Sequence, residues 1–438
     1  MTQAVILAGG KGSRLAALLN GKPKCLVEVD GTPLLERQIE LLASYGVDDI
    51  LLLVNHAADY VARFLAEKSN FGCRIELVDD GHPHGTSGAV LAAFQKLDKR
   101  FIVLYGDTLL NVDLRTFLAQ HDEAGADATL FLHPNDHPAD SDLVEIDADG
   151  WIQAFHPYPH NPARYYPNLV NAALYAVEKS ALSPWRDFKV PSDFGKDLFP
   201  AMLQAGARLK GYKSFEYIKD VGTPARLSKA SEQLRNGLVA RASLARKQKA
   251  VFLDRDGTLN FLRGFVRSAE ALELMQGVAE AVKRLNEAEY RVVLVTNQPV
   301  IARGETSFAE VGNIHAKLES ELGQAGAFLD AVYMCPHHPD GGFAGEVAAL
   351  KMPCDCRKPN TGMIARAVRE LNVDLAQSWL IGDTTLDLET ARRAEVKSIL
   401  VRTGMAGKDG KYDAKPDYTA DTLSDAADLI IAKSEIAS

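Results

Sequence analysis

Two short segments of this chain each follow an apolar run and carry small or acidic residues. The first, LAGGKGSRL, covers residues 7–15, and the second, FLDRDGTL, covers residues 252–259. In α/β folds, the loops that follow the ends of parallel strands hold the ligand. We therefore expect two α/β sites: a glycine-rich loop that holds a nucleoside triphosphate, and a carboxylate nucleophile that removes a phosphate.

Short apolar runs alternate with helical patterns along both halves, as in folds built around parallel sheets. The expected strands cover residues 4–7, 49–54, 75–78, 101–105, 250–253, 291–296, 331–334, 378–381 and 398–401. Helices are expected at residues 34–45, 57–68, 87–97 and 225–235. A chain of 438 residues exceeds one compact core. We predict an α/β protein with two Rossmann-like domains, residues 1–235 with a mixed, mostly parallel sheet and residues 249–438, joined by a linker at 236–248.

The net charge and the length of the apolar runs argue against a nucleic-acid-binding protein and against a membrane protein. The net charge of −9 argues against a nucleic-acid binder, which would need a basic surface. No apolar run reaches the roughly 20 residues of a membrane-spanning helix, and the N-terminus has no signal-peptide pattern. We expect a cytoplasmic enzyme with small-molecule substrates and no nucleic-acid or membrane partner. Whether it is a homo-oligomer is left open.

The first segment has the features of a triphosphate-binding loop. Gly9, Gly10 and Gly12 let the backbone approach phosphate oxygens, because glycine adopts dihedral angles that other residues avoid. Arg14 is suited to the β- and γ-phosphate oxygens, and Lys24 can neutralise charge that develops on the α-phosphate. These five residues predict a nucleoside triphosphate site.

Two aspartates of the same half end further apolar strands. Asp107 follows LYG, and Asp220 follows YIK. Carboxylates at strand ends can hold Mg²⁺ between a triphosphate and its acceptor. A single aspartate is more often a helix cap or a turn residue, so it is the pair that favours a magnesium site.

Up to about residue 235 the chain resembles the sugar-1-phosphate nucleotidyltransferases. The motifs LAGGKGSRL, KPKCLVEVDGTPLL, GTSGA, LYGD, VNAALY and KDVGTP occur in that order. The resemblance implies that a sugar phosphate oxygen attacks the α-phosphorus of a nucleoside triphosphate and releases pyrophosphate. It also implies that Gly85, Thr86 and Gly88 border the nucleoside, and that Glu145 and Asn171 face the sugar.

The second segment places two carboxylates two residues apart at the end of an apolar strand. Because side chains of a strand repeat every two residues, Asp254 and Asp256 are expected to point the same way. One can attack phosphorus, while the other protonates the departing alkoxide and later activates water. Two like charges this close need a cation, which predicts Mg²⁺, and Asp383 in the motif GDTTLD supplies a third carboxylate.

Other polar residues of this half suit a phosphorylated substrate. Thr296 and Asn297 end the next expected strand, and Arg303 follows shortly after them. Arg357 and Lys358 supply positive charge. We expect these five residues to bind the phosphate or another part of the substrate.

Three of the five cysteines lie close together in the second half, with a histidine beside them. Thiolate and imidazole groups suit tetrahedral Zn²⁺, and clustered cysteines make a poor disulfide framework. Arg357 and Lys358 follow the last cysteine directly, so a structural zinc loop would position them. Buried free thiols remain the alternative, and His338 is a rival ligand. The expected ligands are Cys335, His337, Cys354 and Cys356.

Residues from about 249 to 430 resemble the haloacid dehalogenase (HAD) superfamily of phosphatases, and within it the D,D-heptose 1,7-bisphosphate phosphatases and their histidinol-phosphatase relatives. The motifs are DRDGTLN, TNQPVIARG, CPHHP, CDCRKP and GDTTLDLE. The resemblance favours His337 as the zinc ligand. It implies Asp254 as nucleophile, Asp256 as acid and base, and Lys358 as the group that stabilises the phosphoaspartate. Mg²⁺ would be held by the Asp254 carboxylate, the Asp256 backbone and Asp383.

The distance in sequence between Asp254 and Thr296 limits the architecture of this domain. Only about forty residues separate them, which is too few for a large mobile cap. We therefore expect a capless phosphatase domain.

Both halves together favour a bifunctional enzyme of nucleotide-activated heptose synthesis. It would remove the 7-phosphate of D-glycero-D-manno-heptose 1,7-bisphosphate and then activate the heptose 1-phosphate. The resemblance suggests GTP and the α-anomer, giving GDP-heptose for a surface glycan such as lipopolysaccharide. One alternative keeps both reactions on a hexose or aminosugar phosphate, or on histidinol phosphate in the second half. Another treats one half as a non-catalytic nucleotide-sugar sensor.

Overall fold

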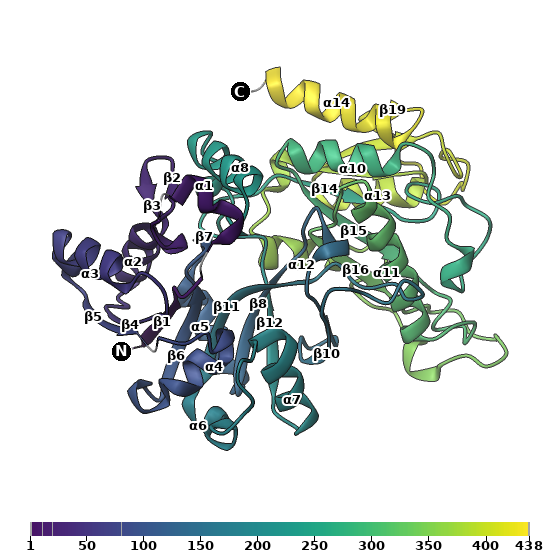
Figure 1. Ribbon diagram of the computed structural model, residues 1–438. Helices are drawn as coiled ribbons and strands as arrows, with labels where there is room; N and C mark the ends of the chain where they lie inside the picture. The colour runs from purple at the N-terminus through teal and green to yellow at the C-terminus, as the bar shows by residue number, and fades with distance from the viewer. Residues whose placement is uncertain (1, 11, 20, 80, 437–438) are drawn as a thin grey trace. The chain divides into compact units, whose positions relative to one another are not determined.

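The computed structural model of this chain describes residues 2–10, 12–19, 21–79 and 81–436, so Lys11 of the first segment lies outside the described residues. The chain divides into two compact units (Figure 1). Unit 1 holds the described residues up to His133, with Asp142–Pro157 and Val170–Ala245. Unit 2 holds Pro134–Ser141, Tyr158–Leu169 and the chain from Arg246 onward. The domain boundaries at residues 235 and 249 stay a prediction.

Unit 1 is built on a mixed sheet, as predicted. Its centre is parallel, because β1 pairs with β4 and β6 in the same direction and β4 pairs in the same way with β5. β11 is antiparallel to β6, β8 and β9, and thereby joins the parallel centre to the remaining strands. The path runs β10-β9-β11-β6-β1-β4-β5, with β8 between β11 and β12. The strands are β1 (Gln3–Leu7), β4 (Asp49–Val54), β5 (Arg74–Asp79), β6 (Arg100–Tyr105), β8 (Ala128–His133), β9 (Leu143–Ile146), β10 (Ile152–His156), β11 (Val170–Glu178) and β12 (Leu209–Lys213).

A second, two-stranded sheet of unit 1 brings distant residues together. β7 (Thr108–Asn111) pairs antiparallel with β13 (Tyr217–Asp220), so that Asp220 lies opposite Thr108. The backbone N–H of Val221 also donates to the Asp107 carbonyl at 2.9 Å. The two aspartates that the sequence suggests as a pair therefore lie on adjacent backbone segments.

The helices of unit 1 follow the predicted positions closely. The expected helix at 225–235 is α8 (Pro224–Arg235), which begins with Thr223 as N-cap and a proline in its first turn. The expected helix at 87–97 is shorter: α4 (Gly85–Ala92) ends early and a 3₁₀ turn, Phe94–Lys96, follows. Other helices are α1 (Ala16–Leu19), α2 (Leu34–Ser44), α3 (Ala58–Glu67), α5 (Leu114–Ala124), α6 (Lys179–Leu182), α7 (Phe199–Gln204) and α9 (Leu238–Arg241).

The sheet of unit 2 is parallel throughout and has the order β16-β15-β14-β17-β18-β19. Five of these strands match the predicted ones to within a residue or so, and β19 was not predicted. Helices α10 and α14 pack against each other in this unit (Figure 1). The strands are β14 (Ala250–Leu253), β15 (Arg291–Asn297), β16 (Ala331–Cys335), β17 (Trp379–Gly382), β18 (Lys397–Val401) and β19 (Tyr418–Ala420); the helices are α10 (Val278–Glu287), α11 (Phe308–Gln324), α12 (Gly362–Leu371), α13 (Thr385–Ala394) and α14 (Leu423–Ile436).

The segment between Asp254 and Thr296 confirms the capless prediction. It contains a 3₁₀ turn at Ala269–Ala271 and the helix α10 before it enters β15. In α10 the residues at positions i, i+3, i+4 and i+7 are buried, namely Val278, Ala281, Val282 and Leu285. The helix therefore belongs to the core of unit 2 and not to a separate cap.

Two short segments that precede the phosphatase motifs in sequence are part of unit 2. Pro134–Ser141 and Tyr158–Leu169 group with it by their contacts. The backbone N–H of Tyr166 donates to Ser320 Oγ on α11 at 3.4 Å, and that hydroxyl lies 3.3 Å from the Tyr166 carbonyl. Neither segment carries a residue that we predict to act in either reaction.

Among the helices of the described residues, none combines the length and the apolar character that crossing a membrane requires.

Candidate active sites

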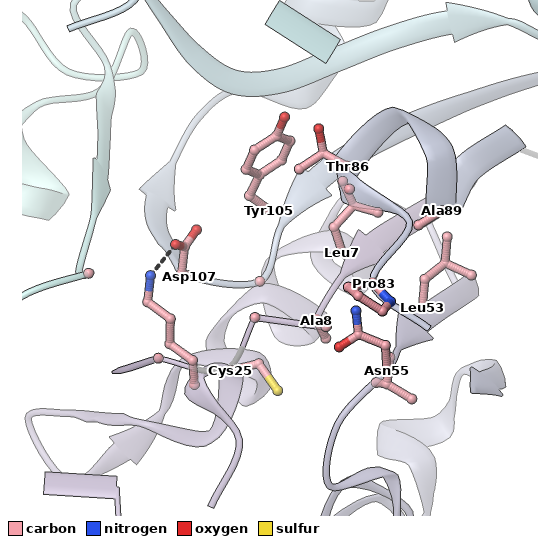
Figure 2. Close-up of a pocket in the computed structure, with 18 of the residues that line it drawn as sticks. Leu7, Ala8, Cys25, Leu53, Asn55, Pro83, Thr86, Ala89, Tyr105 and Asp107 are labelled. Atoms are coloured by element: carbon pink, nitrogen blue, oxygen red, sulfur yellow. Dashed lines mark hydrogen bonds and ion pairs between the residues drawn. The ribbon is translucent and has the colours of Figure 1, made fainter. Parts of the chain in front are cut away.

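Unit 1 has a cavity of about 350 Å³ at the C-terminal ends of its parallel strands. The loop after β1, the end of β4, the first turn of α4 and the end of β6 form its walls (Figure 2). The predicted site residues that line it are Gly9, Gly10, Gly12, Arg14, Lys24, Gly85, Thr86 and Asp107. The structure thus gathers most of the predicted nucleotide-binding residues around one hollow.

Two glycines of this cavity cannot be replaced without strain. Gly12 has φ +61°, and a Cβ there would lie 2.7 Å from Leu19 Cδ1. Gly85 has φ +77°, and a Cβ there would lie 2.3 Å from the Ser192 carbonyl oxygen, which is far inside van der Waals contact. These positions need glycine because the backbone turns tightly and approaches a neighbour closely.

The charged end of the cavity is formed around Gly222. Lys24 pairs with Asp107, which Figure 2 marks with a dashed line. A Cβ on Gly222 would lie 3.0 Å from Asp220 Oδ1, 3.1 Å from Lys24 Nζ and 3.6 Å from an Arg14 nitrogen. Arg14, Lys24 and Asp220 therefore meet at Gly222, and Asp107 is joined to them through Lys24.

Both aspartates at this end already have cationic partners. Arg226 donates to both oxygens of Asp220, at 2.9 and 2.7 Å. Burial alone would raise the pKa of Asp220, but the hydrogen bonds from Arg226 and its charge lower it overall. Oxygen ligands at strand ends fit Mg²⁺. Magnesium held by Asp107 and Asp220 stays a prediction.

The start of α4 is joined to the segment around Ser192. Thr86 Oγ1 donates to Asp193 Oδ2 at 2.7 Å and accepts from the backbone N–H of Phe194 at 3.0 Å. Gly88 packs closely as well, because a Cβ there would lie 3.2 Å from His84 Cβ and 3.4 Å from Ser192 Oγ. Thr86 thus faces the cavity from a fixed position, whereas Gly88 does not line it.

The two predicted sugar residues lie on neighbouring strands beyond this cavity. Glu145, on β9, lies 3.2 Å from His156 Nε2 through Oε2. Asn171, on β11, has its backbone N–H bonded to the Asp142 carbonyl at 3.0 Å, and a Cβ on Gly195 would lie 2.8 Å from its Nδ2. Neither lines the cavity, and their contact with a sugar stays a prediction.

In unit 2, three buried groups meet at the end of the sheet. Lys358 Nζ donates to Asp254 Oδ1 at 2.7 Å and to Asp387 Oδ1 at 2.6 Å. Burial alone would lower the pKa of Lys358, but the two carboxylates more than offset it and raise the pKa well above its usual range. Lys358 is therefore a fixed positive charge beside the predicted nucleophile.

The carboxylate of Asp256 has a separate set of hydrogen-bond partners. It accepts three hydrogen bonds from the buried Arg255 guanidinium, one from Gln298 Nε2 at 2.9 Å and one from Asn260 Nδ2 at 3.1 Å. Burial alone would raise the pKa of Asp256, but Arg255 and the hydrogen bonds from its neighbours lower it overall. Arg255 in turn lies 3.3 Å from His315 Nε2.

The residues at this site fit a divalent cation. One possible metal-binding group among the described residues consists of Asp254, Asp383 and Asp387, with ligand atoms within 4.8 Å of one another. Asp383 Oδ1 is buried and has no hydrogen-bond partner, and burial together with the Asp254 charge raises the pKa of Asp383 to about 7. A cation would satisfy this oxygen and favour the charged form. Both oxygens of Asp387 are already bonded, Oδ1 to Lys358 and Oδ2 to Thr384, whereas Asp254 meets Lys358 through Oδ1. Asp254 and Asp383 are therefore the side chains expected to bind Mg²⁺.

The remaining predicted phosphate-site residues have structural partners. Asn297 donates from Nδ2 to the Lys358 carbonyl at 3.1 Å and accepts from the Lys358 N–H at 3.0 Å, which fixes the backbone that carries the lysine. The Thr296 hydroxyl accepts from Gln298 at 2.9 Å. The Arg303 guanidinium contacts the rings of Phe265 and Phe343, at 4.7 and 4.5 Å from their centroids. A contact of these residues with substrate stays a prediction.

The four predicted zinc ligands form the second possible metal-binding group among the described residues. Cys335 Sγ lies 3.6 Å from Cys354 Sγ, and Cys356 Sγ lies 3.4 Å from both Cys354 Sγ and His337 Nδ1. A tetrahedral Zn²⁺ with Zn–S bonds of about 2.3 Å needs ligand atoms about 3.8 Å apart, so the cage is of the right size. His338 is not part of this group. Arg357 donates to the His337 carbonyl at 3.1 Å, which links the loop to the next residues.

Replacing Cys356 by Ser is expected to remove the metal from this site, because a serine hydroxyl does not supply the thiolate that Zn²⁺ requires. Elemental analysis should give about one zinc per chain for the unchanged protein and below about a tenth of that for Cys356→Ser. Phosphatase turnover should fall as well, because Arg357 and Lys358 follow the lost ligand. Cys73→Ser, in unit 1, is the matched control and should keep its zinc. Equal zinc content in both variants would contradict the site.

Several residues that support the phosphatase site were not predicted. Asp387 is the last residue of the motif GDTTLD, and it pairs with Lys358. Arg255 lies between Asp254 and Asp256 in sequence, where strand alternation predicts that it points away from the two carboxylates. Gln298 and Asn260 donate hydrogen bonds to Asp256. Gln298 directly follows the end of β15 and Asn260 ends the motif DRDGTLN, and these positions could have indicated that both residues belong to the site.

Comparison with known proteins gives a family for each half of the chain. Residues 3–237 match the family described as nucleotidyl transferase, and residues 355–426 match the family described as HAD-hydrolase-like. The D-glycero-beta-D-manno-heptose-1,7-bisphosphate 7-phosphatase of Haemophilus ducreyi is 42% identical over 180 residues, which are 41% of this chain and 96% of that protein. The protein of the same name from Yersinia pestis is 38% identical over 185 residues, 42% of this chain and 96% of that protein.

Solved structures resemble each half separately. HddC from Yersinia pseudotuberculosis, complexed with GMP-PN, covers 53% of this chain and all of its own length, with 26% identity and a TM-score of 0.46. The D,D-heptose 1.7-bisphosphate phosphatase from B. bronchiseptica, complexed with magnesium and phosphate, covers 42% of this chain and 99% of its own length, with 34% identity and a TM-score of 0.37.

Proposed function

We propose that this chain, which belongs to the nucleotidyl transferase family through residues 3–237 and to the HAD-like phosphatases through its C-terminal half, is a bifunctional enzyme of nucleotide-activated heptose synthesis. One half removes the 7-phosphate from D-glycero-D-manno-heptose 1,7-bisphosphate. The other transfers a guanylyl group from GTP to the resulting heptose 1-phosphate. The observation that carries the sugar assignment is the 42% identity to a heptose bisphosphate phosphatase over 96% of that protein's length.

The phosphatase reaction begins at Asp254. Its carboxylate oxygen attacks phosphorus and the bond to the sugar oxygen breaks, which leaves a phosphoaspartate and an alkoxide. Lys358, fixed 2.7 Å from Asp254 Oδ1, stabilises the negative charge of the transferring group. Asp387 keeps that ammonium in place from its other side.

Asp256 acts as the general acid in the first step and as the general base in the second. In the first step its protonated form gives a proton to the departing sugar oxygen, and in the second its carboxylate takes a proton from the water that attacks the phosphoaspartate. The hydrogen bonds from Arg255, Gln298 and Asn260 favour the carboxylate form, which suits the second step. Mg²⁺ held by Asp254, Asp383 and the Asp256 backbone would supply a positive charge to the phosphate oxygens.

The transferase reaction takes place at the charged end of the unit 1 cavity. The sugar phosphate oxygen attacks the α-phosphorus of GTP and pyrophosphate leaves. Lys24 neutralises charge on the α-phosphate, and Arg14 binds the oxygens of the leaving pyrophosphate. The guanine base and the α-anomer rest on the resemblance of the N-terminal motifs.

The two reactions follow one another chemically. Removal of the 7-phosphate leaves the 1-phosphate that the transferase needs, so the product of one half is the substrate of the other. The final product is a nucleotide-activated heptose, which a glycosyl transfer to a surface glycan such as lipopolysaccharide would consume.

Mass spectrometry of the products tests this proposal. The whole protein is incubated with heptose 1,7-bisphosphate, Mg²⁺ and each of the four common nucleoside triphosphates in turn. Inorganic phosphate, pyrophosphate and GDP-heptose are the expected products, with GTP the preferred nucleotide. Faster turnover of histidinol phosphate, or of a hexose or aminosugar phosphate, would overturn the sugar assignment. Preference for another triphosphate would overturn the guanylyl assignment.

A further inference from the structure

The cavity of unit 1 has a charged end and an apolar end. Lys24, Asp107 and Arg14 form the charged end, where the phosphates belong. Figure 2 places Leu53, Pro83 and Ala89 on the other side of the cavity from the Lys24–Asp107 pair. A nucleoside triphosphate that lies with its phosphates at the charged end directs its base toward these apolar side chains.

Asn55 projects into this apolar end. It follows β4 directly, and in Figure 2 its carboxamide lies beside Pro83 and Leu53. Its Oδ1 atom is buried and has no hydrogen-bond partner among the described residues. A buried carbonyl oxygen without a partner is costly in free energy, so such an atom calls for a donor that the bound ligand brings.

The glycine-rich loop makes room for this carboxamide. A Cβ on Gly9 would lie 2.9 Å from both Cγ and Nδ2 of Asn55, and 3.0 Å from Oδ1. Gly9 thus permits the Asn55 side chain to reach the cavity, in addition to any role it has toward the phosphates.

We propose that Asn55 Oδ1 accepts a hydrogen bond from the exocyclic amino group of a bound guanine, and that Asn55 is a specificity-determining residue of the transferase half. The proposal rests on the guanylyl transfer proposed above. A carbonyl oxygen can only accept, so its ligand partner must carry an N–H or O–H group. Ionised phosphates carry none, whereas guanine carries donors at N1 and at its 2-amino group, and the 2-amino group is the one that distinguishes it from hypoxanthine.

The test compares GTP with ITP, which lacks only the 2-amino group. The whole protein is given heptose 1-phosphate and each nucleotide, and kcat/KM is measured from pyrophosphate release. The unchanged protein should prefer GTP by about 10-fold or more, because ITP leaves the Asn55 oxygen without a partner. In Asn55→Leu, which has a similar shape and no acceptor, the preference should fall to within about 2-fold.

Two further variants make the test decisive. Asn55→Asp keeps an acceptor oxygen in the same shape and should keep the preference for GTP over ITP, even if both rates fall. Gln95→Ala changes an exposed residue outside the cavity and should leave the preference unchanged. Equal use of GTP and ITP by the unchanged protein would overturn the proposal, and so would a preference that survives in Asn55→Leu.

A third nucleotide distinguishes the base from the ribose. If the 2′-hydroxyl of the ribose were the donor, the unchanged protein would use dGTP with a lower kcat/KM than GTP, and Asn55→Leu would use the two equally well. The preference for GTP over ITP would then not depend on Asn55, and the proposal would be wrong. Failure of this inference differs visibly from failure of the proposed function. In the first case GTP remains the preferred triphosphate but ITP equals it, and in the second GTP is not the preferred triphosphate at all.

Discussion

Replacing Asp254 by Asn is expected to lower phosphatase turnover by about 10⁴-fold or more. The amide has nearly the same shape as the carboxylate and can still accept the hydrogen bond that Lys358 now makes to Asp254. It cannot attack phosphorus, so no phosphoaspartate forms. The rate of phosphate release from the bisphosphate measures the loss, and pyrophosphate release with heptose 1-phosphate should remain unchanged.

The control for this variant is Asp413→Asn, an exposed aspartate of the same unit, which should keep both activities. Circular dichroism should show that Asp254→Asn is folded. If the variant kept more than about a hundredth of the phosphatase rate, Asp254 would not be the nucleophile. Loss of pyrophosphate release in the same variant would mean that the two activities depend on each other.

The residues of the phosphatase site that follow strand ends could be predicted from local patterns in the sequence. Asp254, Asp256 and Asp383 follow apolar strands, and the strands lie where the alternation of apolar runs placed them. Asp387 was missed because its position is ambiguous in sequence. With Thr384 it forms a capping box at the start of α13, which is an ordinary reason for an acidic residue there, while its other oxygen binds Lys358.

Contacts between residues far apart in the chain could not be predicted from the sequence. Arg255 meets His315 across 60 positions of the chain, and Thr86 meets Asp193 across 107. No local period or motif connects such residues, because only the folded sheet brings their segments together. The same holds for Arg226, which neutralises Asp220 and appears in sequence as one of many helix-surface arginines.

The unpredicted role of Asn55 has a different cause. It ends a strand, as the predicted ligand residues Asp107 and Asp254 do, and the same argument from strand ends applies to it. An asparagine carries no charge, so its position in the sequence alone does not suggest phosphate or metal chemistry. What singles it out is the buried oxygen without a partner, and that is visible only when the neighbouring atoms are in place.

Replacing Lys24 by Met is expected to lower the kcat of nucleotidyl transfer by about 10²–10³-fold, with a smaller effect on the KM for the nucleotide. Methionine keeps much of the length of the side chain but removes the charge that pairs with Asp107. The reason is that charge on the α-phosphate grows in the transition state, when the sugar phosphate oxygen and the leaving pyrophosphate are both partly bonded. Pyrophosphate release at varied GTP concentration separates the two constants.

Lys22→Met provides the matched control, because Lys22 is exposed, lies two positions away and does not line the cavity. It should keep transferase activity, and both variants should keep phosphatase activity. Lys24→Arg restores a positive charge, but the larger, planar guanidinium carries it at a different place from the ammonium, so we expect only partial recovery. A Lys24→Met variant that raised KM and left kcat unchanged would show that Lys24 binds the nucleotide equally in the ground and transition states. The charge near Gly222 would then serve binding, and the catalytic contribution would have to come from Arg14 or from a metal held by Asp107 and Asp220.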